Sequence, residues 1–175
     1  KKERRRKPMA PFTTSSLQQE AFKRLNFTTK KTMMMAQQLY EGVNIGKEGS
    51  VGLITYMRTD SVRISETAVA DIRSFVEAEY GPNYLPTKPN IFSSKKNAQD
   101  AHEAIRPTSI ERTPESLEAY LSKDQLKLYG IIWKRALASQ MAEAIYDVTT
   151  LQVEAGEYLL NASGSILKFD GFLKL

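Results

Sequence analysis

The change of hydrophobic period near residue 146 constrains the fold of this chain more than any other feature. Up to that point, apolar residues recur at the three- and four-residue spacing of amphipathic helices. From Tyr146 onward apolar and polar residues alternate, Gly156 interrupts the alternation, and two further runs follow at Tyr158–Ala162 and Ser165–Phe169. The pattern predicts a helical block followed by antiparallel strands.

The beginning of the chain predicts an extended segment. Residues 1–7 hold six basic side chains and one Glu, and Pro8 and Pro11 keep the chain extended up to Phe12. The late strands are expected to pair with this segment or with residues outside the sequence. We therefore expect an α+β fold, mainly α, in which a helical domain (13–145) is inserted into a partial antiparallel β domain (1–12 and 146–175).

Composition narrows the classes of function. Hydrophobic residues make up 41% and charged residues 26% of the chain, which predicts a packed core. The net charge of +5 suits a polyanionic partner such as nucleic acid. The absence of cysteine excludes disulfides and thiolate metal sites, and the single histidine, His102, argues against a histidine-based metal site. No apolar run is long enough to cross a membrane, so we expect a soluble intracellular protein.

Two short helices and a glycine-rich connection predict a winged-helix-like arrangement. Ser15 and Gln18 fit a capping box at the start of the first helix. Asn26 to Thr29 separates it from a second helix, and the glycine-rich connection of residues 46–52 leads into a strand. This order is typical of winged-helix DNA-binding modules. The expected apolar faces are Leu17, Ala21 and Leu25 with Phe22 beside them, and Met33, Ala36, Tyr40 and Val43.

Two further helices and a long loop follow. Ser65 is expected to cap a helix that Gly81 ends. Residues 82–100 predict a polar loop. A capping box of Ser122 and Gln125 begins the last helix, in which Trp133 is expected to anchor the core.

The stretch of residues 52–61 carries the side chains that are most suited to a chemical reaction. Its first half predicts a strand from Gly52 to Tyr56, because the residues are apolar or β-favouring, and its end predicts a polar turn. Tyr56 and Arg58 lie where the strand gives way to the loop. The spacing by itself favours a buried aromatic residue beside a solvated arginine.

A second charged cluster occupies residues 100–108. It gathers Asp100, His102, Glu103 and Arg106 within seven residues. One interpretation is a surface turn with a local ion pair. The other is one wall of a phosphate-binding site.

The two clusters together suit phosphoryl transfer. A phenol such as Tyr56 has a pKa near 10 and needs a neighbouring cation to attack a phosphodiester at neutral pH. Arg58 offers a planar fork that matches two phosphate oxygens, and His102 can donate a hydrogen bond or move a proton. Asp60 or Glu103 can hold either group in place. Because no acidic metal-binding array occurs in the sequence, we expect the chain to be incomplete as a catalyst.

These motifs resemble a known family. Residues 52–61, GLITYMRTDS, are similar to the active-site tyrosine segment of bacterial DNA topoisomerase I, a type IA topoisomerase. Residues 101–108, AHEAIRPT, resemble its second signature, and residues 10–19 and 30–41 are similar to the segments that precede these. The resemblance runs essentially from end to end. The first residue is Lys rather than Met, and we expect the chain to be a piece of a larger enzyme.

The resemblance implies a reaction and a set of site residues. Tyr56 would attack one DNA strand and stay joined to its 5′ phosphate while the other strand passes through the gap. The break would then be resealed without ATP, so that negatively supercoiled DNA relaxes. Arg58 would contact the scissile phosphate and His102 would position DNA. Further family positions match Thr55, Thr59, Asp60, Gln37 and Glu41, with Arg106 as a DNA contact.

The resemblance also implies a cofactor and partners. The family holds Mg²⁺ on acidic residues of a Toprim domain, and none of those acids lies in this sequence. The expected partners are single-stranded and negatively supercoiled DNA and the Toprim domain of the same polypeptide. Residues 1–12 and 146–175 would be strands of the family's β arch. The expected location is the bacterial cytoplasm, at the nucleoid, and the piece alone is expected to be inactive.

Two other classes of function stay open at this point. A helix-turn-helix module without chemistry, in which Tyr56 is structural, is the interpretation that the residues favour without the resemblance. It predicts sequence-selective binding of duplex DNA. A third is a protein-interaction domain that uses the methionine-rich helix around residues 33–35.

Overall fold

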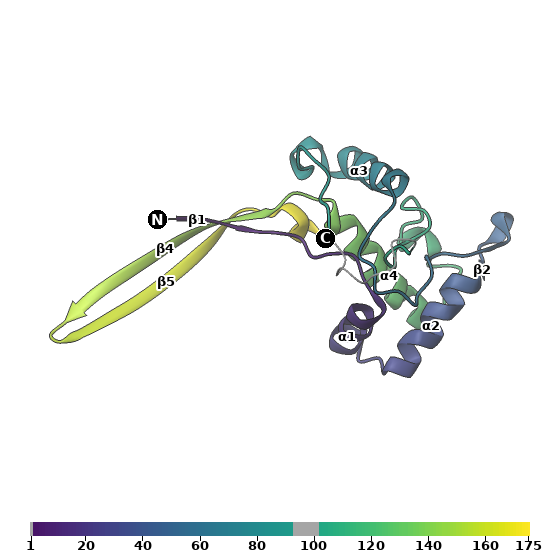
Figure 1. Cartoon of the computed structure of the whole chain (residues 1–175), viewed down its shortest axis with the longest axis horizontal. Helices are drawn as coiled ribbons and strands as arrows, with labels where there is room; N and C mark the ends of the chain where they lie inside the picture. Colours follow the sequence, from purple (N-terminus) through teal and green to yellow (C-terminus); the bar gives the residue numbers. More distant parts are fainter. Residues whose placement is uncertain (1, 93–101) are drawn as a thin grey trace.

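A computed structural model describes residues 2–92 and 102–175. In this part of the chain, helices form a body from which a long hairpin projects as an arm (Figure 1). Asp100 of the second charged cluster and most of the second half of the long polar loop lie outside the described residues. The α-helices are α1 (Thr14–Leu25), α2 (Thr29–Glu41), α3 (Glu66–Tyr80) and α4 (Lys123–Ser139). The strands are β1 (Lys2–Arg6), β2 (Val43–Asn44), β3 (Ser50–Val51), β4 (Ala144–Ala155) and β5 (Tyr158–Phe169).

The arm is a three-stranded antiparallel sheet at its base and a two-stranded hairpin at its tip. The strand order is β1-β4-β5, and Lys2 lies opposite Val148. Of the two partners expected for the late strands, the N-terminal segment is the one that the structure shows. The two predicted runs after Gly156 form one continuous strand, β5, in which Gly164 lies opposite Thr149. These strands and the helical body confirm the mainly α, α+β fold class.

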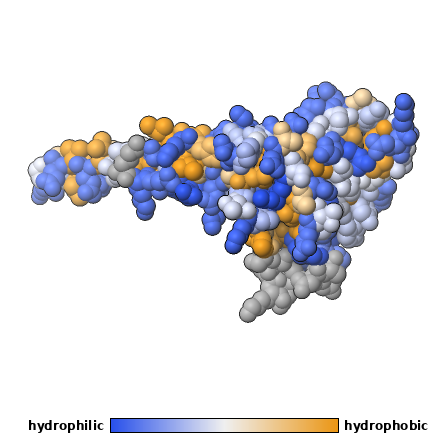
Figure 2. All heavy atoms as spheres, turned by 90° about the horizontal axis from the view of Figure 1, so that it is seen from above, coloured by the Kyte–Doolittle hydropathy of each residue, from blue (hydrophilic) through white to orange (hydrophobic). Residues whose placement is uncertain are grey.

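One face of the arm is apolar and exposed. Leu151 lies opposite Ala162, and Val153 lies opposite Leu160. Leu151, Val153 and Leu160 are each more than half exposed. Figure 2 shows hydrophobic residues along the arm, between hydrophilic ones. A lone two-stranded hairpin is marginally stable in water, so the contacts at its base, including the Tyr84 ring 5.1 Å from that of Phe169, help to hold it.

The helical body has one core, to which α2, α3 and α4 contribute apolar faces. Trp133 is the predicted anchor: it is 5% exposed, its indole N–H donates to the Ile110 carbonyl (2.9 Å), and its ring meets Phe75 edge-on. No described helix is long and apolar enough to cross a membrane.

The predicted caps are right for two helices and wrong for the first. Ser65 caps α3, and Ser122 with Gln125 forms the capping box of α4. The capping box of α1 consists of Thr13 and Ser16, not Ser15 and Gln18. Thr13 has the extended backbone of an N-cap residue, whereas Ser15 already lies in the first helical turn.

The buried face of α2 also differs from the prediction. Thr32, Met35, Ala36 and Leu39 are buried. Tyr40 is 41% exposed, because it lies about 100° around the helix from Leu39. The hairpin of β2 and β3 follows α2, so the described order of helix, helix and hairpin agrees with the winged-helix-like prediction.

Candidate active site

Residues 52–61, the tyrosine segment, do not form the predicted strand. β3 ends at Val51, and beyond it Ile54 makes only an isolated antiparallel bridge with Pro107. In the first half of the segment, the backbone groups bond to two different elements. The Leu53 N–H donates to the carbonyl of Leu39 in α2 (2.8 Å), and the Thr55 N–H donates to the carbonyl of Arg106 (2.9 Å). The first half of the segment is therefore fixed by two neighbours, without a continuous partner strand.

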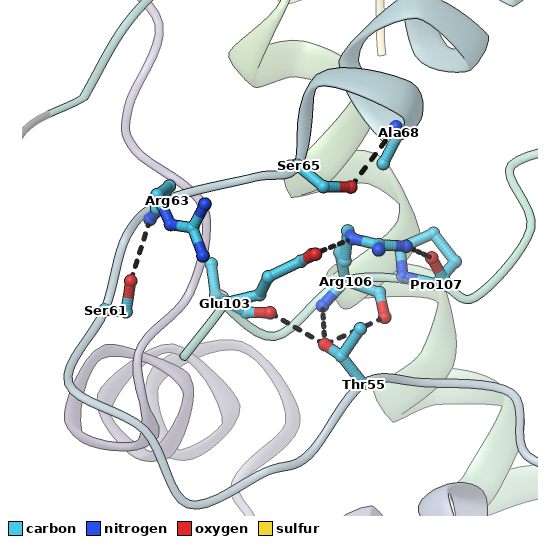
Figure 3. A network of polar contacts seen from close by, with 9 residues as sticks. Thr55, Ser61, Arg63, Ser65, Ala68, Glu103, Arg106 and Pro107 are labelled. Carbon is cyan, nitrogen blue, oxygen red and sulfur yellow. Dashed lines mark hydrogen bonds and ion pairs between the residues drawn. The ribbon is translucent and has the colours of Figure 1, made fainter. Parts of the chain in front are cut away.

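The second motif runs beside the tyrosine segment. The Thr55 hydroxyl donates to the Ala104 carbonyl (2.7 Å) and accepts from the Arg106 N–H (3.0 Å) (Figure 3). The Thr108 hydroxyl donates to the Gly52 carbonyl (2.7 Å). The two clusters that the sequence singled out are thus joined by hydrogen bonds at Gly52 and Thr55, on the N-terminal side of Tyr56.

The side chains of the tyrosine segment divide between the core and solvent. Leu53, Ile54 and Met57 are at most 5% exposed, whereas Tyr56 is 43% exposed and Arg58 is exposed. The interpretation of Tyr56 as a buried aromatic residue is therefore wrong. The Tyr56 phenol is therefore accessible to a molecule in solution, while the backbone that carries it is held by hydrogen bonds.

α2 places a second tyrosine beside Tyr56. The Tyr40 ring meets the Tyr56 ring edge-on, with 5.3 Å between centroids and 61° between planes. Gln37 and Glu41 lie three residues before and one residue after Tyr40, and the Gln37 amide donates to the Glu41 carboxylate (2.7 Å). Sequence reasoning assigned Tyr40 to the core. Its three-residue spacing from the candidate residue Gln37 was the signal for the exposed face.

The other predicted residues lie at the surface or support the backbone. Arg58, Asp60 and His102 are exposed. Thr59 shapes the turn, since its hydroxyl accepts from the Ser61 N–H (3.1 Å). Within the described ranges, no hydrogen bond or ion pair joins the side chains of Tyr56, Arg58 and His102. Their roles in a reaction stay predictions.

Glu103 and Arg106 form a partly buried ion pair that supports the second motif. The Arg106 Nε donates to the Glu103 carboxylate (2.6 Å), and the two side chains are 14% and 22% exposed. Arg106 also donates to the Pro107 carbonyl (3.0 Å). Burial raises the pKa of Glu103, but hydrogen bonds from Arg106 and Ser65 and the Arg106 charge outweigh it and lower that pKa below 4.5. The DNA contact foreseen for Arg106 stays a prediction.

The Glu103→Gln variant is expected to be less stable than the parent at neutral pH and to lose part of its pH dependence. A carboxyl group whose pKa is lowered by folding stabilises the folded state above its unfolded pKa, near 4.5, and loses this contribution as the pH falls through the folded pKa. The stability difference between parent and variant should therefore shrink below pH 4.5. Urea unfolding from pH 3 to pH 7 measures it, and a constant difference would contradict the ion pair's role.

The Gly52→Ala variant is expected to destabilise the junction between α2 and the tyrosine segment. A Cβ atom at Gly52 would lie 2.8 Å from the Tyr40 carbonyl oxygen, so the backbone has to shift. We expect a loss of about 1–3 kcal/mol in the free energy of unfolding. Gly130→Ala in α4 is the control, because its Cβ meets nothing within 4 Å and should stabilise by up to about 1 kcal/mol. Equal effects of the two variants would contradict the close approach.

The described residues do not fit a metal ion. Within residues 2–92 and 102–175, no three His, Cys, Asp or Glu side chains come together as a ligand set.

Comparison with known proteins decides the family. A family model described as DNA topoisomerase matches residues 1–175. The chain belongs to the DNA topoisomerase family. DNA topoisomerase 1 of Rickettsia felis is 57% identical over 178 residues, which cover 100% of this chain and 23% of that protein. DNA topoisomerase 1 of Xylella fastidiosa strain 9a5c is 55% identical over 174 residues, which cover 98% of this chain and 21% of that protein.

The fold agrees with a solved topoisomerase. Full-length topoisomerase I from Thermotoga maritima superposes with a TM-score of 0.87 and 43% sequence identity, over 99% of this chain and 28% of that chain. The resemblance to bacterial topoisomerase I is confirmed by these relatives. The chain spans 21% to 28% of the length of these three proteins.

Proposed function

We propose that this chain is the nucleophile-bearing part of a type IA DNA topoisomerase. The observation that carries the proposal is the exposure of Tyr56 on a segment whose Leu53, Ile54 and Met57 side chains are buried. The backbone of this segment is hydrogen-bonded to α1, α2 and the second motif. Residues 13–145 are the domain that carries the tyrosine, and residues 1–12 and 146–175 belong to the β arch. The membership of the DNA topoisomerase family supports the proposal.

The proposed reaction exchanges one phosphodiester bond for another, so the free energy of the broken DNA bond is kept in the phosphotyrosine bond. The Tyr56 oxygen attacks the phosphorus, the bond from phosphorus to the 3′ oxygen breaks, and a phosphotyrosine bond to the 5′ phosphate forms. The phenol loses a proton and the departing 3′ oxygen gains one. Attack by the 3′ hydroxyl reverses each change, so that religation needs no ATP. In between, the other strand passes through the gap, and negatively supercoiled DNA relaxes.

The neighbouring side chains have distinct proposed roles. Arg58 binds the non-bridging oxygens of the scissile phosphate and stabilises the charge that develops on them. His102 positions the DNA backbone. Asp60, Gln37 and Glu41 line the approach to Tyr56, and the hydrogen-bonded Thr55 and Thr59 hold the backbone on which Tyr56 and Arg58 lie.

The proposed partners are single-stranded and negatively supercoiled DNA and a Toprim domain of the same polypeptide. Mg²⁺ on that domain would supply positive charge near the phosphate. The proposed location is the bacterial cytoplasm. A helix-turn-helix module without chemistry is the second candidate, favoured by the order α1, α2 and β2–β3 hairpin.

The polarity of DNA labelling tests the proposal. The full-length protein is incubated with a single-stranded oligonucleotide carrying a radiolabel at one end and is then denatured. A 3′-end label should migrate with the protein, because the 5′ phosphate of the downstream piece is bound to Tyr56, and a 5′-end label should not. The module without chemistry predicts no labelled protein from either end and selective binding of duplex DNA. Labelling from the 5′ end would contradict the proposed linkage.

A further inference from the structure

We propose that Thr14 is a positioning residue for Arg58, an inference that rests on the proposed function. Arg58 lies between Met57 and Thr59, and the Thr14 side chain bonds to the backbone of both neighbours. The Thr14 hydroxyl donates to the Met57 carbonyl (2.6 Å) and accepts from the Thr59 N–H (2.8 Å). The Thr14 N–H donates to the Thr59 carbonyl (2.9 Å). One residue of α1 thus holds the backbone on both sides of the arginine.

The frame that carries Thr14 is itself rigid. Thr14 is the first residue of α1, and the capping box of Thr13 and Ser16 fixes the start of that helix. Leu17 and Ala21 bury α1 in the core with no exposed surface. The bond from the Thr14 N–H also gives a partner to one of the first N–H groups of a helix, which have none within the helix. Movement of residues 57–59 would therefore break bonds to a fixed element.

The exposed side chain explains why this support matters. The Arg58 guanidinium is exposed and forms no ion pair with a carboxylate in the described parts of the chain. Its position therefore depends on the backbone from which it extends. A site gains catalytic power when the groups around a phosphate are held before the reaction, and displacement by about 1 Å can cost about 100-fold in rate. Thr14 supplies that support without touching DNA.

The test uses variants of the full-length protein. Thr14→Val keeps the shape of the side chain but removes both hydroxyl bonds, whereas Thr14→Ser keeps the hydroxyl. We expect Thr14→Val to slow single-turnover cleavage of a 3′-labelled oligonucleotide by about 10- to 100-fold. Thr14→Ser should stay within about threefold, and non-covalent binding of the oligonucleotide to either variant should change little. Thr14→Ala replaces Thr14→Val if the valine variant does not fold.

A double-mutant cycle separates positioning from general damage to the fold. If Thr14 acts through Arg58, Thr14→Val should not slow cleavage further in a protein that already carries Arg58→Ala. Cleavage by the Arg58→Ala proteins is slower and is followed over longer times. The role of Thr14 would be overturned if Thr14→Val slowed cleavage by the same factor in both backgrounds, or if it left cleavage by the parent unchanged. Neither result would affect the proposed function. A parent protein that forms no adduct would instead overturn the proposed function.

Discussion

Replacing Tyr56 with phenylalanine in the full-length protein is expected to abolish both the covalent DNA adduct and relaxation. The change removes the oxygen that attacks phosphorus and leaves the aromatic ring, which packs edge-on against Tyr40. The rate of cleavage should fall by more than about four orders of magnitude, as expected when a nucleophile is removed. The free energy of unfolding should change by less than about 0.5 kcal/mol, because Tyr56 is 43% exposed.

The neighbouring tyrosine provides the matched control. Tyr40→Phe removes the phenol hydroxyl of the exposed tyrosine beside Tyr56 and keeps the contact between the two rings. Cleavage by this variant should stay within about tenfold of the parent, since the loss of one neutral hydrogen bond costs about 0.5–1.5 kcal/mol. Denaturing gels with a 3′-labelled oligonucleotide measure both variants. An adduct that survives in Tyr56→Phe and vanishes in Tyr40→Phe would reverse the assignment.

Removing the Arg58 guanidinium is the second change with a large expected effect. Arg58→Ala should slow cleavage by about 10²- to 10³-fold, because it removes the cation that stabilises charge on the phosphate oxygens as the new bond forms. Folding should be intact, since the side chain is exposed. Arg58→Lys should recover only part of the rate, because an ammonium lacks the planar fork that binds two oxygens.

Rate and binding have to be measured separately for Arg58. Single-turnover cleavage reports the transition state, and a fluorescent single-stranded oligonucleotide reports non-covalent binding. We expect the loss to fall mainly on the cleavage rate. Unchanged cleavage by Arg58→Ala would remove Arg58 from the site, and an equal loss in binding and rate would make it a DNA-binding residue only.

Features that depend on a few neighbouring residues could be predicted from the sequence. Ser65, Ser122 and Gln125 cap the helices that they were expected to cap, because a cap forms between residues three positions apart. The change of period near Tyr146 correctly predicted the arm, since alternation reflects the two faces of a strand. The exposed Arg58 was also expected.

Three features of the site that depend on distant partners could not be predicted. The β-favouring residues from Leu53 to Tyr56 make no strand, because their backbone N–H groups donate to two different elements. The acceptors are the carbonyl groups of Leu39 and Arg106. Tyr40 was placed in the core, although the face of α2 is set by packing against α4 and the face that carries Tyr40 stays exposed. Thr14 gave no local signal, since its partners lie 43 and 45 residues away.

The most direct test of the central claim is to map the residue that carries DNA. The full-length protein is trapped with a short oligonucleotide, digested with protease and nuclease, and analysed by tandem mass spectrometry. We expect one modified peptide in which the phenol oxygen of Tyr56 bears a nucleotide joined through its 5′ phosphate. A nucleotide on Tyr40 or on any other residue, or a linkage through a 3′ phosphate, would contradict the account.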